Sequence, residues 1–290
     1  MFPENSYGMV KRFHFLEQNI KSSAPRDVLD IGCGNGYYLT IPLACAFPLV
    51  RFVGVDTDGK SIELARSANS LANLQFLLLG EVREERKYDL VIASEVIEHV
   101  EDPEEFLIFL KRRLKPAGQI FLSLPNGYGP FEMSCLVEAF VHLLLLRPLS
   151  CCKRTILSYA RVRKTEQGVF PDEGIARDTL ASSPHVNFFS LRAICRLIEN
   201  AGLRIVALSS RTFLCGYLFD RLIRSNRWIV WNASIVDRLP KIFASDWMFL
   251  LEVDPRLKAA RSGHRRSLYA RLRRWISVRR LPPEPTGEVG

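Results

Sequence analysis

The chain has 290 residues, of which 48% are hydrophobic and 24% charged, and these proportions exclude a collagen-like, a wholly disordered and a disulfide-rich protein. The formal net charge is +9, but the segment from Arg256 to Arg280 alone holds ten lysines and arginines and no acidic residue. The remainder is close to neutral, which argues against a protein that binds nucleic acid over its whole surface.

The first part of the chain alternates between predicted strands and helices. A leading helix is expected over Met9–Ile20, where apolar and charged residues recur at helical spacing. Four apolar runs then predict strands, with two helices between the first three of them. The strands are Val28–Ile31, Arg51–Asp56, Leu74–Leu79 and Tyr88–Ala93, and the helices are Tyr37–Phe47 and Ile62–Ala68.

The best-marked helix follows the fourth strand. Asp102 can cap its N-terminus, Pro103 suits its first position, and the basic run Lys111–Arg113 suits its end. Pro116–Gly118 ends this helix, and Gln119–Leu124 is a predicted fifth strand. This order predicts an α/β fold in which helices cover both faces of a parallel sheet.

The alternation resumes after a long interruption. Ser190 begins a helix that Gly202 stops, and Leu203–Leu208 and Trp247–Val253 are predicted as the last two strands. We therefore expect a core at 1–126, an inserted helical cap at 127–189, the rest of the same domain with a helical insertion at 190–254, and a basic tail at 255–290.

The most informative stretch joins the first strand to the next helix. Asp30 is followed by three glycines at alternate positions, Gly32, Gly34 and Gly36. Spaced glycines after a strand let the backbone approach a ligand closely and direct a helix N-terminus at it. Asp56 ends the next strand, where a carboxylate can accept both ribose hydroxyls of an adenosine.

These features also fit a nicotinamide-dependent oxidoreductase, or a tight turn that binds nothing. Two details favour a different ligand. The glycines follow a GxGxG pattern and not GxGxxG, and Asp30 stands directly before the loop. A carboxylate there would repel a pyrophosphate but attract the ammonium and sulfonium groups of S-adenosylmethionine (SAM).

Four stretches carry a resemblance to a known family. They are VLDIGCGNG, FVGVD, YDLVIASEVIEHVEDPEEFL and LKPAGQIFLSLPN. In this order they resemble the motifs of class I SAM-dependent methyltransferases, and most of all the ubiquinone-biosynthesis O-methyltransferase-like group. The resemblance is good over Asp27–Asn126 and weaker over His185–Leu203. It implies a Rossmann-like seven-stranded sheet with an antiparallel last strand, and SAM as the cofactor.

The resemblance also assigns roles to residues at the carboxyl ends of the strands. It implies that the glycine loop contacts the methionine part of SAM through Asp30, Gly32, Cys33 and Gly34. It implies that Asp56 and Thr57, after the second strand, contact the ribose, and that Glu81, after the third, lies near the adenine. Ser94 and Glu95, at the end of the fourth strand, would flank the cofactor.

Methyl transfer from a sulfonium mainly requires that the reactants be positioned, so no fixed catalytic residue is demanded. A general base is needed when a hydroxyl must lose its proton, and His185 and His99 are the candidates. For His185 the alternative is a loop anchor. Asn126 follows the fifth strand at the ligand-binding edge, so it either lines the acceptor site or forms a turn.

A metal site is a further hypothesis. Glu95, Glu98 and His99 have the spacing of one helical face and would converge on a hard divalent ion. In the ubiquinone-type O-methyltransferases this E-x-x-E-H pattern is associated with a metal, which makes Mg²⁺ the candidate. The alternative gives Glu98 and His99 a structural or substrate-lining role.

Two apolar segments bear on membrane binding. Phe131–Leu146 is too short to cross a bilayer and predicts either a cap helix over the acceptor pocket or an interfacial helix that admits a lipid-like acceptor. In the tail, four apolar residues lie near one helical face among arginines, namely Leu268, Leu272, Trp275 and Ile276. This pattern is typical of a helix on an anionic membrane surface, while an RNA-binding arm and a solvated tail stay as alternatives. The absence of an RNA-recognition motif disfavours nucleic acid.

The function predicted from the sequence is methyl transfer from SAM to a small or lipid-like acceptor, with oxygen as the accepting atom. A nicotinamide-dependent oxidoreductase and a non-catalytic, membrane-associated SAM-binding module are the alternatives. The seven cysteines are irregularly spaced and are interpreted as reduced thiols. The start, MFPENSYGMVKRFHF, lacks a basic segment followed by an apolar run, so we expect a cytoplasmic protein, at most peripheral at a membrane.

Overall fold

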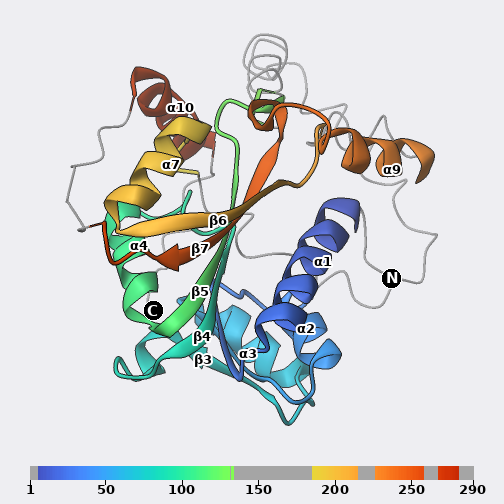
Figure 1. Ribbon diagram of the computed structural model, residues 1–290, viewed down its shortest axis with the longest axis vertical. Coiled ribbons are helices and arrows are strands. Elements are labelled where there is room, and N and C mark those ends of the chain that lie inside the picture. The colour runs from blue at the N-terminus through green and yellow to red at the C-terminus, as the bar shows by residue number, and fades with distance from the viewer. Residues whose placement is uncertain (1–5, 131, 134–184, 215–225, 258–266, 281–290) are drawn as a thin grey trace, which may run out of the picture.

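A computed structural model describes residues 6–130, 132–133, 185–214, 226–257 and 267–280 of the chain. Its centre is a seven-stranded sheet in the order β3-β2-β1-β4-β5-β7-β6 (Figure 1). Strands β1 to β5 are parallel, and β7 runs antiparallel to both of its neighbours. The expected Rossmann-like sheet with an antiparallel last strand is therefore confirmed. The strands are β1 (Asp27–Ile31), β2 (Arg51–Asp56), β3 (Leu74–Leu78), β4 (Tyr88–Ser94), β5 (Leu114–Pro125), β6 (Leu203–Ser210) and β7 (Asp246–Val253).

The helices divide between the two faces of the sheet, with α1, α2 and α3 on one side and α4 and α7 on the other (Figure 1). Two hydrophobic clusters correspond to these faces, one built around the side chains of α1 to α3 and one around those of α4 and α7. The helices are α1 (Ser6–Ser23), α2 (Thr40–Ala46), α3 (Gly59–Ala68), α4 (Pro103–Arg112), α7 (Leu191–Asn200), α9 (Asn226–Ile235) and α10 (Leu268–Arg280). Single 3-10 turns occur at η1 (Leu79–Glu81) and η4 (Lys241–Phe243).

Side-chain caps set the start of three helices. The Asp102 carboxylate accepts the backbone N–H groups of Glu104 and Glu105 at the start of α4, and the Ser190 hydroxyl caps α7, both as predicted. Helix α3 begins three residues earlier than expected because Asp58 accepts the N–H of Ser61.

The starts of α2 and β5 also differ from the prediction. Helix α2 begins at Thr40 and not at Tyr37, because Gly36 has a positive φ of 72° and the chain is still turning after it. Strand β5 begins at Leu114, five residues early, and its pairing with β4 shifts register between Tyr88 and Leu90.

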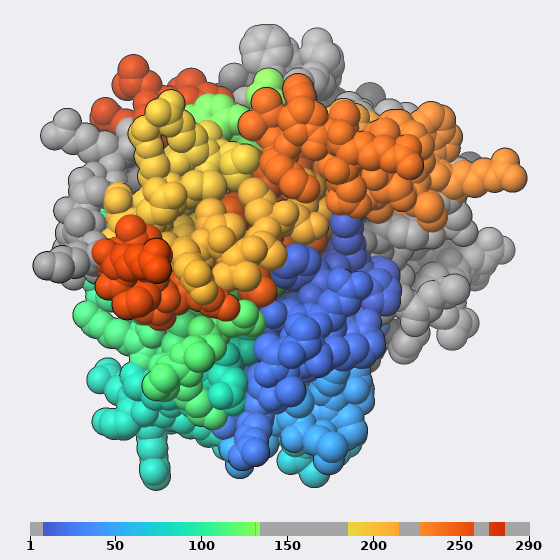
Figure 2. All heavy atoms as spheres, in the orientation of Figure 1, coloured from blue at the N-terminus to red at the C-terminus, as the bar shows by residue number. Residues whose placement is uncertain are grey.

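The later part of the chain forms the upper end of the molecule in this view. Helices α9 and α10 both lie there, on opposite sides of the carboxyl end of β5 (Figures 1 and 2). The predicted cap at 127–189 and the apolar run Phe131–Leu146 fall mostly outside the described residues, so both stay predictions. Across the described ranges, no helix combines the length and apolar content that crossing a bilayer requires.

Candidate functional site

The glycine loop lies at the centre of the sheet's carboxyl edge, where the chain connections diverge on either side of β1. Gly32, Gly34 and Gly36 all have positive φ values, of 72°, 55° and 72°. The N–H groups of Gly32 and Cys33 donate to the carbonyl of Val55, at 2.8 and 3.1 Å. A Cβ on Gly32 would come within 2.4 Å of a methyl group of Val96, so a side chain there is excluded sterically as well as by its backbone conformation.

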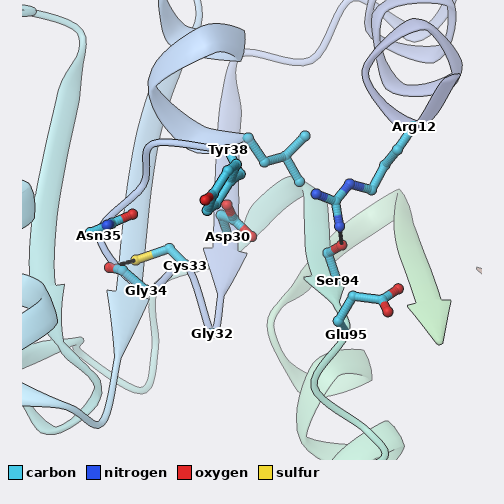
Figure 3. Close-up of a pocket in the computed structure, with 10 residues that line it drawn as sticks. Arg12, Asp30, Gly32, Cys33, Gly34, Asn35, Tyr38, Ser94 and Glu95 are labelled. Atoms are coloured by element: carbon cyan, nitrogen blue, oxygen red, sulfur yellow. Dashed lines mark hydrogen bonds between the residues drawn. The ribbon is translucent and has the colours of Figure 1, made fainter. Parts of the chain in front are cut away.

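A small cavity of about 80 Å³ adjoins this loop and contains one buried acid and one buried base. Asp30 accepts a hydrogen bond from the Thr40 hydroxyl at 2.6 Å, and its burial raises the pKa of this carboxyl to about 7. Arg12 reaches down from α1 and donates to the Ser94 hydroxyl at 2.6 Å (Figure 3). Burial lowers the pKa of Arg12. These charges suit the ammonium and carboxylate groups of a bound amino acid.

Arg12 was not predicted as a site residue. It lies on the buried face of α1, which also carries Gly8 and Leu16 four residues to either side. A charged residue in the middle of an apolar helical stripe was therefore the signal that the sequence offered. Its partner Ser94 is 82 positions away along the chain, so the local pattern of α1 does not predict the contact between them.

A larger cleft of about 580 Å³ lies on the other side of the loop and shares Gly32 with the small cavity. Asp56 and Thr57 line it. The Asp56 carboxylate accepts the N–H groups of Gly34 at 2.8 Å and of Asp58 at 3.0 Å, which fixes its orientation. Each carboxylate oxygen keeps a second lone pair for a ligand hydroxyl. A ligand crossing Gly32 would thus join an amino-acid group on one side to a ribose on the other.

Ser94 and Glu95 are held in a chain of polar contacts at the end of β4. The Ser123 hydroxyl lies 2.9 Å from the Ser94 hydroxyl and donates to Glu95 Oε1 at 2.9 Å. Arg211 lies 3.4 Å from the same Glu95 oxygen. Burial would raise the pKa of Glu95, but Arg211 and Arg12 hold it below its usual range. Glu95 is therefore an ionised group at the mouth of the small cavity.

Glu81 lines neither cavity. Its carboxylate accepts hydrogen bonds from Nη2 of Arg66 on α3, at 2.7 Å, and from the backbone N–H of Leu78, at 2.8 Å. Leu79, two residues earlier, lines the large cleft instead. A contact from Glu81 to the adenine of a bound cofactor stays a prediction.

Two histidines and one glutamate converge beside the large cleft. Ligand atoms of Glu98, His99 and His185 lie within 4.8 Å of one another, and His99 lines the cleft. Glu98 is 1% exposed, and within the described structure neither of its oxygens has a hydrogen-bond partner. Burial, together with nearby Glu95, raises the pKa of Glu98 to about 8. For His185 burial lowers the pKa, but the hydrogen bond to Glu132 and the charges of Glu132, Glu98 and Glu95 together outweigh burial, so the net pKa is raised.

This cluster differs from the metal ligands predicted from the E-x-x-E-H spacing. The segment from Glu95 to Val100 is a turn and not a helix, and Glu95 pairs with Arg211. His185 takes the third place in the cluster. One carboxylate and two imidazoles do not fit Mg²⁺, which prefers oxygen ligands.

The loop before α7 brings His185 to this position. The N–H groups of Val186 and Asn187 both donate to the carbonyl of Glu98, at 2.9 and 3.0 Å. The Asn187 side chain donates to the carbonyl of Val100 at 2.6 Å. These bonds attach the His185 loop to the turn that carries Glu98.

The comparison with known proteins now decides the family. The family described as "Methyltransferase domain" matches residues 5–208. The chain belongs to this family. The match confirms the expected class I SAM-dependent methyltransferase and its cofactor SAM, and it decides against the nicotinamide-dependent alternative.

Named relatives match over shorter stretches. The ubiquinone biosynthesis O-methyltransferase of Rickettsia bellii (strain OSU 85-389) is 30% identical over 120 residues, which is 40% of this chain and 50% of that protein. The malonyl-[acyl-carrier protein] O-methyltransferase of Halalkalibacterium halodurans is 32% identical over 123 residues, covering 40% and 44%. The chain thus spans about half the length of these relatives.

Among solved structures, a SAM-dependent methyltransferase from Clostridium acetobutylicum ATCC 824 aligns over 87% of this chain and 93% of its own. The sequence identity is 12% and the TM-score is 0.49.

The side chains that line the two adjoining cavities suit both ends of the methyltransferase cofactor. The buried Asp30 and Arg12 would hold the methionine ammonium and carboxylate, and Asp56 would hold the ribose hydroxyls. The cofactor would then pass over Gly32, which lines both cavities. Cys33, also in the loop, lies at the rim of the small cavity as a free thiol.

Asn126 lines neither cavity of the methyltransferase. Its amide nitrogen donates to the carbonyls of Ile242 and Ala244, both at 2.8 Å, and its oxygen accepts the N–H of Tyr128 at 3.1 Å. These are the contacts of a turn-forming residue that ties β5 to the segment before β7. A role toward the acceptor stays a prediction.

Proposed function

We propose that this chain transfers the methyl group of SAM to an oxygen atom of a small or lipid-like acceptor. The observation that carries the proposal is that His99, with Glu98 and His185 behind it, lines the same cleft as the ribose acid Asp56. An imidazole beside the cofactor is suited to take the proton of an acceptor hydroxyl. The R. bellii and H. halodurans relatives are named as O-methyltransferases, which supports the same atom.

In this proposal the protein mainly binds and orients its two reactants. Asp30 and Arg12 fix the amino-acid end of SAM, and Asp56 fixes its ribose. His99 and His185 stand at the acceptor side, where one of them accepts the proton of the acceptor hydroxyl.

Cofactor binding can be tested first, by isothermal titration with S-adenosylhomocysteine. Asp56→Ala should weaken binding by about 1.5–3 kcal/mol, because hydrogen bonds to a charged group are lost. Asp237→Ala, which removes a surface aspartate paired with Lys11, is the matched control and should bind as the wild type does. Absence of binding to a folded wild-type protein would contradict the proposal.

The accepting atom can be tested with SAM and a panel of matched acceptors, a phenol, a carboxylic acid and an aromatic amine on the same alkyl chain, with products identified by mass spectrometry. Methylation of an oxygen is expected. Methylation of the amine alone would contradict the proposed oxygen acceptor and show that nitrogen is the accepting atom. Binding of S-adenosylhomocysteine without transfer to any acceptor would favour the non-catalytic SAM-binding module.

We also propose that the outer face of α10 rests on an anionic membrane surface and brings the site to lipid-like acceptors. Leu268, Leu272 and Trp275 are 81%, 56% and 53% exposed on this helix. Arg271, exposed on the same helix, and the nearby basic residues of the tail provide the charge that anionic headgroups attract. Trp228 and Trp231 of α9 are exposed at the same end of the molecule (Figure 1).

Flotation with vesicles of anionic or zwitterionic lipid tests this docking. We expect binding to anionic vesicles that weakens with salt, and a reduced bound fraction for Leu272→Glu. Leu49→Glu, at a leucine that is 96% exposed between α2 and β2, controls for the added charge. Equal flotation of the two variants would contradict the proposal, and retention on RNA instead of vesicles would favour the RNA-binding alternative.

A further inference from the structure

Helix α10 lies beyond residues 5–208, which match the family, yet its inner face packs against the segment that follows β5. The Tyr269 ring stacks on Tyr128, with ring centroids 4.5 Å apart, and its hydroxyl donates to the carbonyl of Gly127 at 3.1 Å. Ala270 is buried in the same contact. The helix is therefore docked directly after the end of β5.

One buried arginine extends from α10 toward the site. Arg273 is 5% exposed, and its guanidinium lies 5.0 Å from the ring centroid of Phe188. It forms an ion pair with Oε2 of Glu132, which is itself buried. The other oxygen of Glu132, Oε1, lies 2.8 Å from Nδ1 of His185. A single carboxylate thus joins the C-terminal helix to a histidine of the Glu98 cluster.

We propose that Arg273 and Glu132 are positioning residues that hold His185 with its proton on Nδ1 and its Nε2 unprotonated. This inference rests on the proposed function in that it makes His185, rather than His99, the acceptor's base. Arg273 forms an ion pair with Oε2 of Glu132, and a carboxylate in such a pair only accepts hydrogen bonds. Neutral His185 must therefore donate from Nδ1, which leaves the Nε2 lone pair available.

The reaction then balances with the groups at hand. The acceptor oxygen takes the methyl carbon while its O–H bond breaks and the proton passes to Nε2 of His185. The electron pair of the C–S bond remains on the sulfur, which becomes uncharged. Glu132 stabilises the imidazolium that forms, in the way that a buried carboxylate supports the histidine of a hydrolase triad.

The charged groups around His185 come from several elements, and only one of these groups, Arg273, lies on α10. Glu98 and His99 approach from the turn after β4, with Glu95 nearby, and Glu132 from the segment after β5. Arg273 is the contribution of the C-terminal helix.

The neighbouring residue on α10 supplies a matched control. Arg274 pairs through both of its terminal nitrogens with Glu101, at 2.7 and 3.0 Å, and Glu101 is largely exposed. Arg274→Gln therefore removes the same charge and one docking contact from the same helix but leaves Glu132 paired. Arg273→Gln removes the charge that faces Glu132.

The test is ¹⁵N NMR of histidine-labelled full-length protein bound to S-adenosylhomocysteine, at a pH where His185 is neutral, with His185→Gln assigning its signals among the five histidines. We expect the Nδ1–H tautomer in the wild type and in Arg274→Gln, and a mixture of tautomers in Glu132→Gln and Arg273→Gln. An Nε2–H tautomer in the wild type, or equal spectra for Arg273→Gln and Arg274→Gln, would overturn the inference.

A kinetic readout separates positioning from simple destabilisation. With an acceptor from the panel, Arg273→Gln should lower kcat by roughly tenfold or more, since a general base contributes roughly 10²- to 10⁴-fold. The affinity for S-adenosylhomocysteine should be unchanged, and Arg273→Lys should restore part of the rate. A kcat equal to that of Arg274→Gln contradicts the inference. If the NMR spectra show the expected tautomer but the protein methylates no acceptor, the proposed function is contradicted and the positioning of His185 is not.

Discussion

Asp30 is the residue whose charge state matters most for the cofactor site. Its pKa is raised from 3.8 to about 7, mainly by burial, although Thr40 and Arg12 act in the opposite direction. The folded, cofactor-free protein therefore keeps a proton that the unfolded chain releases near pH 4. Because the folded state binds this proton more tightly than the unfolded chain does, the carboxyl contributes stability at low pH, and that contribution is lost as the pH rises through 7.

The same carboxyl should make cofactor binding depend on pH. Since the cationic groups of SAM favour ionised Asp30, SAM should bind about tenfold more tightly at pH 8 than at pH 6. Isothermal titration at both pH values measures this, with Asp30→Asn expected to bind weakly and without that slope. An equal slope in Asp30→Asn would assign the pH dependence to another group.

The glycine loop and Asp56 could be predicted because their pattern is local. Asp30, Gly32 and Gly34 lie within five consecutive residues, and Asp56 ends the next strand. The Glu98 cluster could not, since it depends on tertiary contacts. His185 reaches Glu132 from 53 positions away, and Glu95, with a φ of +58°, leaves the helical spacing that its sequence suggested.

Among the secondary-structure elements, α4 is the one whose local signals all agree. Its cap, its proline at the first turn and its basic end were read from the sequence and recur in the structure. Because α4 also lines the large cleft through Phe106 and Phe109, its start fixes one wall of the proposed acceptor side. The predicted start of β5 was wrong because Pro116 and Gly118, which usually interrupt regular structure, lie inside this strand, whose pairing with β4 is irregular there.

The cap of α4 has a measurable contribution. Asp102→Ala should lower the free energy of unfolding by about 1 kcal/mol, because two backbone N–H groups lose their acceptor. Asp102→Asn keeps an oxygen acceptor and serves as the control, expected close to the wild type. Urea unfolding measures both, and equal losses in the two variants would attribute the effect to charge instead of capping.

At the scale of the whole molecule, the family match and the folded unit do not coincide. Residues 5–208 cover β1 to β5 and most of β6, whereas β7 at Asp246–Val253 lies between β5 and β6 and pairs with both. Trp247 and Phe249 of β7 are fully buried in the core. All seven strands are predicted from local patterns, and the family resemblance implies that the last one is antiparallel, but its placement between β5 and β6 is seen only in the structure.

Truncation should distinguish the end of the family match, at residue 208, from the end of the folded unit after β7. A chain ending at residue 257 keeps β7 and should unfold cooperatively, although it lacks α10. A chain ending at residue 208 should not, since β6 then has no partner strand and the core loses Trp247 and Phe249. Circular dichroism during thermal unfolding measures both, and cooperative unfolding of the shorter chain would show that β7 is dispensable.

The position of β7 also bears on how the protein is made. Strands β1 to β5 can pair as they leave the ribosome, each beside a neighbour that has already emerged. Strand β6 cannot, because its neighbour in the sheet is synthesised after it. During that interval the nascent chain exposes the free edge of β5 together with an unpaired β6, which is the kind of surface that aggregates. Translation speed between residues 210 and 253, and chaperone access to the nascent chain there, should therefore influence the yield of folded protein more than changes earlier in the message.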